Sequence, residues 1–220
     1  MNIILVRHGE SVNNVPGAVW RPDPDLTPRG LEQARLLGKR CEGMAIDAIL
    51  CSPTLRTLRT ANEISIRKNN MPVQVLHELV EVGTDYSIRS HARALEACPA
   101  VLPYENVPVG DYGDAYGLAV KDPLYLQSRA CRVISRVRQT FAQDASVVLV
   151  AHVGFNQYLL AAALWMSRPG FKFLQDNTCM NIINYNLGED GRETTRLVMM
   201  NDTSHLNNQL SQSDAPPMKH

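Results

Sequence analysis

The chain has 220 residues, of which 45% are hydrophobic and 20% charged, as is typical of a globular protein that buries a sizeable core. Its 22 basic and 22 acidic residues cancel, so bulk charge favours neither nucleic acid nor an anionic membrane as a partner. No apolar run reaches the roughly 20 residues that a membrane span needs, and the N-terminus lacks the pattern of a signal peptide. We therefore expect a cytoplasmic protein.

The cysteines support the same expectation. They are odd in number and scattered, without any Cys-x-x-Cys pair, which argues against a disulfide framework and against structural zinc. We expect reduced thiols at all five positions: Cys41, Cys51, Cys98, Cys131 and Cys179.

The first predicted element is a strand over residues 3–6. Four consecutive apolar residues are typical of a buried parallel strand, and Arg7, His8 and Gly9 follow it at once. Open α/β sheets bind their ligands just past the carboxyl ends of their strands. A cation and an imidazole are thus expected where such folds carry out chemistry, and Gly9 lets the backbone approach a ligand closely.

Strands and helices alternate along the rest of the chain. A proline-rich loop over residues 15–25 precedes a predicted helix from Pro28 to about Glu42, for which Thr27 is a suitable N-cap. Further strands are predicted at 45–51, 73–76 and 145–151, further helices at 53–66, 123–143 and 153–166, and two late strands at 180–187 and 194–200. This order predicts an α/β fold with a doubly wound, mostly parallel sheet and helices on both faces.

We expect a single domain over residues 1–202. Within it, residues 84–121 show weak periodicity, many prolines and glycines and one short helix near 89–97, which indicates a lid-like insertion over the site. Residues 203–220 are rich in Ser, Asn, Gln and Pro and are predicted to be a disordered tail.

Polar residues follow the ends of four predicted strands. Arg7 and His8 follow the first, Arg56 lies one helical turn past the second, Glu78 follows the third and His152 the fourth. In a doubly wound fold these ends converge on one crevice. Arginines suit phosphate, a histidine can act as nucleophile, and a carboxylic acid can protonate a leaving alcohol. The set predicts phosphoryl transfer through a histidine.

Each residue taken singly has a plainer interpretation. Arg56 would suit a solvated helix face, His152 a satisfied interior histidine, and Glu78 a surface acid at a strand end. Other chemistries fit less well. The histidines lack metal-binding helical spacing, and neither a Gly-x-Ser-x-Gly elbow nor a P-loop is present. No metal is expected.

Six motifs, in order, resemble those of the histidine phosphatase superfamily, also called the phosphoglycerate mutase-like family. They cover most of residues 1–83 and 145–187. The motifs are Leu5–Ser11, Leu26–Ala34, Cys51–Ala61, Leu76–Glu78, Val150–Gly154 and Asn177–Tyr185.

The resemblance implies a role for each matching position. His8 would be the nucleophile that forms a phosphohistidine, and Arg7, Arg56 and His152 would hold the phosphoryl oxygens. Glu78 would donate a proton to the leaving group.

The resemblance also implies a phosphate pocket completed by Asn14, with help from Ser11. It implies catalysis without a metal or any other cofactor, because the positive pocket itself stabilises the developing charge. The expected partner is a small phosphorylated substrate. The oligomeric state is left open, with a homodimer as one option.

Departures from the family pattern leave alternatives. The acidic, glycine-containing run after Glu78 is altered, so that Glu81 remains a rival proton donor, and Val153 stands where glycine is commoner. The Gly-Trp motif and the Arg- and Tyr-rich segments of the mutases lack clear counterparts. We therefore favour a phosphomonoesterase of the phosphatase branch over a cofactor-dependent phosphoglycerate mutase, with a non-catalytic phospho-ligand binding domain as the third hypothesis.

The substrate is expected to be set by the insertion. The residues there that are candidates to reach it are Arg89, His91, Arg93, Tyr112, Tyr116 and Lys121.

Overall fold

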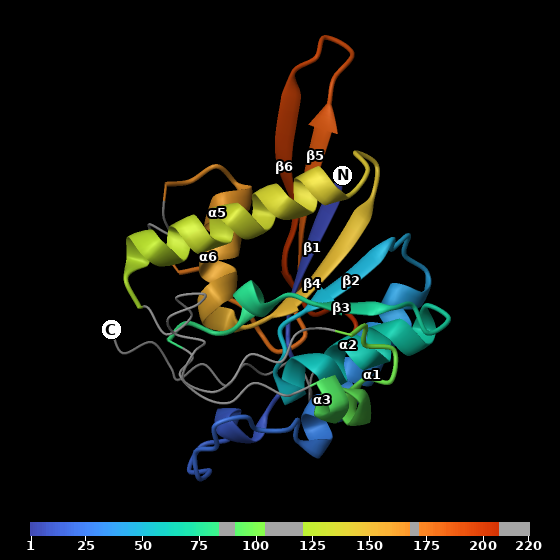
Figure 1. Cartoon of the computed structure of the whole chain (residues 1–220), viewed down its shortest axis with the longest axis vertical. Helices are drawn as coiled ribbons and strands as arrows, with labels where there is room; N and C mark the ends of the chain where they lie inside the picture. The colour runs from blue at the N-terminus through green and yellow to red at the C-terminus, as the bar shows by residue number, and fades with distance from the viewer. Residues whose placement is uncertain (84–90, 104–120, 168–171, 207–220) are drawn as a thin grey trace.

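The computed structural model describes residues 1–83, 91–103, 121–167 and 172–206 (Figure 1). Most of the predicted insertion and residues 207–220 of the predicted tail lie outside this part of the chain. Among the insertion candidates, this holds for Arg89, Tyr112, Tyr116 and the side chain of His91.

A six-stranded sheet runs through the molecule in the order β3-β2-β4-β1-β5-β6. Its strands are β1 (Asn2–Arg7), β2 (Ala48–Cys51), β3 (Val73–Val75), β4 (Ser146–Ala151), β5 (Met180–Leu187) and β6 (Glu193–Asp202). The first four are parallel, β5 is antiparallel to β1, and β6 is antiparallel to β5. The predicted mostly parallel sheet is confirmed.

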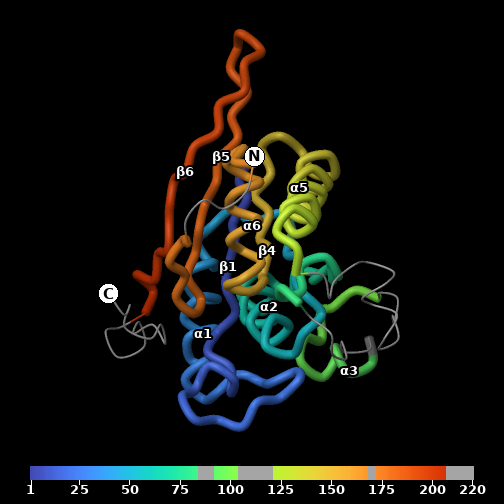
Figure 2. The backbone as a smooth tube through the Cα atoms, turned by 90° about the vertical axis from the view of Figure 1, so that its left-hand side faces the viewer, coloured from blue at the N-terminus to red at the C-terminus, as the bar shows by residue number. Residues whose placement is uncertain are grey.

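Helices cover both faces of this sheet, as Figures 1 and 2 show from two sides. The α-helices are α1 (Pro28–Glu42), α2 (Leu55–Arg67), α3 (His91–Ala97), α5 (Pro123–Thr140) and α6 (Val153–Ala163). Two short 3₁₀ helices, η1 (Val12–Asn14) and η2 (His77–Leu79), follow β1 and β3. The α/β class and the doubly wound arrangement are thus confirmed.

The alternation of side chains along β1 explains why both faces need helices. Ile3 and Leu5 pack into the core under α5 and α6, whereas Ile4 and Val6 pack into the core under α1 and α2. A strand with apolar residues at every position must be buried on both sides. The apolar run that predicted the strand therefore also accounts for the two helical layers.

Capping chemistry fixes where α1 begins. Thr27 accepts a hydrogen bond on its side-chain oxygen from the Gly30 backbone N–H at 3.0 Å, and Pro28 occupies the first turn. Both features were predicted from the sequence. The start of α2 was predicted two residues early, because Pro53 and Thr54 precede Leu55 in extended or turn conformations.

The first residues of the predicted tail are ordered. Leu206 donates its backbone N–H to the carbonyl of Thr203 at 2.8 Å, and His205 contacts the hydroxyl of Thr178 at 3.2 Å. A polar composition did not reveal the local turn that closes onto the loop before β5.

Candidate active site

The carboxyl ends of β1, β2 and β4 open onto one cavity of about 310 Å³. This size is at the small end of typical ligand pockets. The residues that line the cavity are Arg7, His8, Ser11, Asn13, Asn14, Trp20, Pro22, Pro24, Arg56, Glu81, Val82, Gly83 and Val153.

The hydrogen bonds of His8 determine which of its ring nitrogens faces a substrate. Nε2 lies 3.2 Å from Nε of Arg56, and Nδ1 lies 2.7 Å from the carbonyl oxygen of Gly9. An arginine only donates, so Nε2 accepts and Nδ1 carries the proton that it donates to Gly9. The lone pair of Nε2 is therefore held beside a guanidinium, as a nucleophile toward phosphorus requires.

Arg56 joins His8 to His152. Its terminal nitrogen lies 3.1 Å from Nδ1 of His152, so by the same reasoning Nε2 of His152 carries the proton and donates it to the hydroxyl of Ser52 at 2.9 Å. The two imidazole rings lie edge to face with centroids 5.2 Å apart. Arg56 also lies 3.8 Å from a carboxylate oxygen of Asp23, a contact that orients the guanidinium.

Burial keeps both histidines neutral. Burial is the largest cause of a His8 pKa well below the ordinary 6.5, and the charges of Arg56 and Arg7 lower it further. The pKa of His152 is lowered well below that value first by burial and then by Arg56. A neutral His8 keeps the free electron pair that nucleophilic attack needs.

Arg7 is held from the side of β5. Its guanidinium donates to the carbonyl of Gln175 at 2.8 Å, and the amide of Asn177 donates to the carbonyl of His8 at 3.1 Å. Neither Gln175 nor Asn177 had been predicted as a site residue. Asn177 opens the last of the six motifs, which was the signal available for it, whereas Gln175 lies outside those motifs.

Ser11 and Asn14, the two residues expected to complete a phosphate pocket, both line the cavity. The side-chain oxygen of Asn14 accepts from the backbone N–H and from the hydroxyl of Ser11, both at 2.9 Å. This capping arrangement leaves the amide group of Asn14 beside the cavity that both residues line.

The two candidate acids lie in different places. Glu78, within η2, forms an ion pair with Arg136 of α5 at 2.8 Å and is not among the cavity residues. Glu81 lines the cavity with His8, and its carboxylate accepts the backbone N–H groups of Gly154 at 3.1 Å and Phe155 at 2.8 Å. The structure therefore places Arg7, His8, Ser11, Asn14 and Arg56 around one cavity, with His152 bonded to Arg56, and holds Glu78 apart from them.

Two further features concern cofactors and surroundings. Among the described residues, no group of three or more His, Cys, Asp and Glu side chains is arranged to hold a metal ion. No helix in the described ranges is long and apolar enough to cross a membrane.

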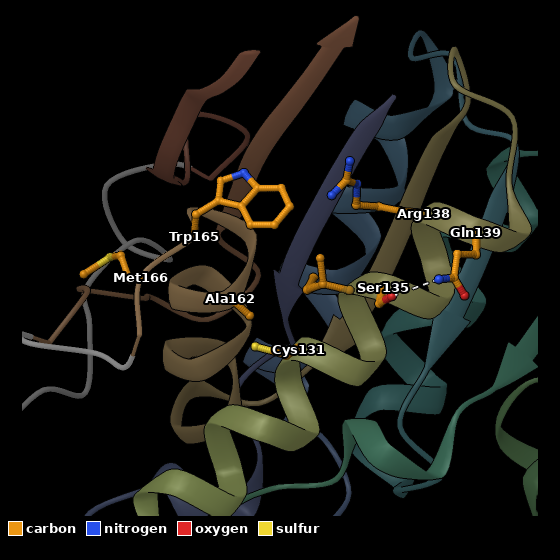
Figure 3. A pocket seen from close by; sticks show the side chains of 8 residues that line it. Cys131, Ser135, Arg138, Gln139, Ala162, Trp165 and Met166 are labelled. Carbon is orange, nitrogen blue, oxygen red and sulfur yellow. Dashed lines mark hydrogen bonds between the residues drawn. The ribbon is translucent and has the colours of Figure 1, made fainter. Parts of the chain in front are cut away.

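A second cavity, of about 460 Å³, lies between α5 and α6 (Figure 3). It shares no lining residue with the first. Trp165 lies at its edge, with the guanidinium of Arg138 5.1 Å from its ring, and its indole N–H donates to the hydroxyl of Thr195 at 2.8 Å. None of its residues belongs to the predicted catalytic set.

Known proteins of similar sequence include a phosphatase and a mutase. The chain is 29% identical over 192 residues to the adenosylcobalamin/alpha-ribazole phosphatase of Escherichia coli, covering 84% of this chain and 91% of that protein. It is 32% identical over 123 residues to a 2,3-bisphosphoglycerate-dependent phosphoglycerate mutase of Arabidopsis thaliana, covering 53% of this chain and 35% of that one.

A solved structure shares the fold. The phosphoserine phosphatase mutant of Entamoeba histolytica, in complex with phosphoserine, matches with a TM-score of 0.64 at 21% identity, covering 94% of this chain and 99% of that one. The family model of the histidine phosphatase superfamily, branch 1, matches residues 3–203. The chain therefore belongs to the histidine phosphatase superfamily, as its motifs indicated.

Proposed function

We propose that this protein is a metal-independent phosphomonoesterase that hydrolyses a small phosphorylated metabolite through a phosphohistidine on His8. The observation that carries the proposal is the lone pair on Nε2 of His8, held at the cavity by Arg56 with Nδ1 anchored on Gly9. The kinship with phosphatases supports the reaction class.

In the first step, Nε2 of His8 attacks phosphorus and the bond to the leaving oxygen breaks. The guanidiniums of Arg7 and Arg56 bind the phosphoryl oxygens, where charge develops, and Arg56 exchanges its hydrogen bond to His8 for one to an oxygen. The leaving oxygen takes the electron pair and a proton, and the alcohol departs.

In the second step, water attacks the phosphohistidine. Its oxygen forms the new bond to phosphorus, its proton passes to the carboxylate that protonated the leaving group, and the P–N bond breaks. The electron pair returns to Nε2 of His8. Inorganic phosphate leaves, and the site is restored.

We assign the proton transfers to Glu81 rather than to Glu78. Glu81 shares the cavity with His8, and three backbone N–H groups, those of Val82, Gly154 and Phe155, fix its carboxylate at the start of α6. Glu78 is held by Arg136 instead. A proton donor must lie within reach of the leaving oxygen; Glu81 lines the cavity, whereas Glu78 is not among its lining residues.

The nucleophile is tested by trapping. Wild-type protein mixed with a substrate labelled in its phosphoryl group and quenched in alkali should retain label, because phosphohistidine survives alkali. His8→Ala should retain none and release no phosphate, while its circular dichroism spectrum stays unchanged. Full turnover by His8→Ala would refute the assignment.

Assays on the same wild-type protein distinguish the proposed phosphatase from the two alternative functions, a mutase and a binding domain. A mutase would interconvert 3-phosphoglycerate and 2-phosphoglycerate when primed with 2,3-bisphosphoglycerate, whereas the proposed enzyme releases phosphate. A pure binding domain would release none from any substrate of a broad panel.

As to location, all five cysteines are free thiols, which supports the expected cytoplasmic setting.

A further inference from the structure

Trp20 is an exposed aromatic residue at the mouth of the catalytic cavity. It lines that cavity together with His8, yet 63% of its surface is exposed. Exposing so large an apolar side chain forgoes the hydrophobic free energy of its burial. Because Trp20 and His8 line one cavity, a substrate bound with its phosphoryl group at His8 lies in the cavity that the indole lines.

The loop that carries Trp20 is tied down by hydrogen bonds to the residues that follow the indole. Asn13 exchanges two hydrogen bonds with the backbone of Arg21, at 2.7 and 3.0 Å, directly beside Trp20. Two residues further along the loop, Asp23 accepts the backbone N–H of Leu55 at 2.8 Å, at the start of α2. These bonds tie the loop to the segments that carry the phosphate pocket, so the indole stays in register with His8.

Trp20 shares the cavity wall with apolar side chains as well as with polar ones such as Asn13 and Glu81. Pro22 and Pro24 extend the same wall, and Val82 and Val153 belong to the same cavity. The two arginines that line it, Arg7 and Arg56, lie with His8 at its base. The cavity thus combines arginines suited to a phosphoryl group with an exposed indole and four smaller apolar side chains.

We propose that Trp20 is a specificity-determining residue that stacks on an aromatic ring carried by the leaving alcohol. The preferred substrate is a phosphomonoester whose alcohol bears an aryl or heteroaryl group near the ester oxygen. Aromatic side chains contact such rings in offset or edge-to-face geometry, which a saturated chain of the same length cannot match. This inference rests on the proposed phosphatase activity and names its substrate class.

The test compares benzyl phosphate with propyl phosphate, whose leaving alcohols are similar in acidity and differ in the ring. We expect Trp20→Ala to lower kcat/KM for benzyl phosphate roughly tenfold by raising KM, with kcat nearly unchanged. The reason is that the indole contacts the ring both in the bound substrate and in the transition state. Propyl phosphate should be affected by less than about twofold. Trp20→Phe should recover most of the loss.

The chain supplies a matched control. Trp165 is equally exposed, at 65%, but lies at the second cavity (Figure 3). Trp165→Ala should leave both substrates unaffected. Because the chain has 2 tryptophans, Trp165→Phe leaves Trp20 as the sole tryptophan, whose fluorescence then reports on ligand binding beside it. Benzyl phosphonate should change that fluorescence, whereas inorganic phosphate should leave it nearly unchanged.

Equal losses for benzyl and propyl phosphate in Trp20→Ala would overturn the proposal, because Trp20 would then only support the loop. Unchanged kinetics for both would also overturn it. In either case wild-type turnover would leave the phosphatase assignment intact. Failure of the wild type to release phosphate from both compounds, and from a broader panel, would instead count against the proposed function itself.

Discussion

Replacing each candidate acid by its amide gives the sharpest test of the catalytic assignment. Glu81→Gln removes the transferable proton and keeps the shape of the side chain. General acid catalysis contributes about 10²- to 10⁴-fold, or about 3 to 5 kcal/mol of barrier. We expect a loss of that size for propyl phosphate, whose alkoxide is a poor leaving group, and a much smaller loss for p-nitrophenyl phosphate.

The structure also sets the stability cost of this replacement. One carboxylate oxygen of Glu81 accepts from Val82 and Phe155, and the other from Gly154. Glutamine keeps the first oxygen but presents an N–H₂ group to the N–H of Gly154. The loss of one such bond is worth about 1 to 3 kcal/mol of unfolding free energy. Kinetics should therefore be measured well below the melting temperature of the variant.

Glu78→Gln is the matched control. It breaks only the ion pair with Arg136, whose side chain is 55% exposed, and such pairs contribute less than about 1 kcal/mol. Both substrates should be hydrolysed at near wild-type rates. A loss confined to propyl phosphate in Glu78→Gln, with Glu81→Gln unaffected, would refute the reasoning and restore Glu78 as the donor.

Three further predictions concern stability, each measured by urea unfolding. Gly30→Ala places a Cβ 1.9 Å from a backbone oxygen and should destabilise the fold by about 1 to 3 kcal/mol, whereas Gly43→Ala, with nothing within 4 Å, should have little effect. Arg129→Ala should lower the free energy of unfolding by about 2 kcal/mol or more, because this fully buried side chain stacks on the ring of Phe155 at 3.8 Å and donates to the carbonyl of Val80 at 2.9 Å. Arg132 is exposed and serves as the control: Arg132→Ala should change the free energy of unfolding by less than about 0.5 kcal/mol. His8 and His152 have pKa values lowered well below 6.5 in the folded protein, first by burial and then by Arg56. Below pH 6.5 the unfolded chain therefore binds more protons than the folded protein. The free energy of unfolding should be constant above that pH and should fall by about 1.4 kcal/mol per pH unit for each histidine as the pH drops. A flat profile between pH 6.5 and the folded pKa values would contradict the neutral state of these histidines.

Much of the fold could be predicted because it follows from local pattern. The buried runs of β1 and β4 and the cap at Thr27 are each encoded within a few residues. The meeting of Arg7, His8 and Arg56 then follows from the rule that parallel strands share one carboxyl edge.

The choice between the two acids could not be predicted in the same way. Both follow β3 within a few residues, and strand-end position does not distinguish them. What separates them is tertiary: η2 turns Glu78 toward Arg136 on α5, and the extended Val80 delivers Glu81 to the start of α6. Neither partner is near in sequence, so no local pattern could indicate the outcome.

The close approach of Gly9 and Gly30 has a consequence for how this enzyme changes over evolution. A Cβ on Gly9 would lie 2.5 Å from the carbonyl oxygen of Gly30, and one on Gly30 would lie 1.9 Å from that of Glu10. The segment around His8 and the first turn of α1 are thus in tight backbone contact. A side chain larger than glycine at either position would require the other segment to move. Residues 15–22, in the loop that carries Trp20, are all exposed. New substrate preferences should therefore arise from amino-acid substitutions in that loop, whereas the residues around His8 should change little.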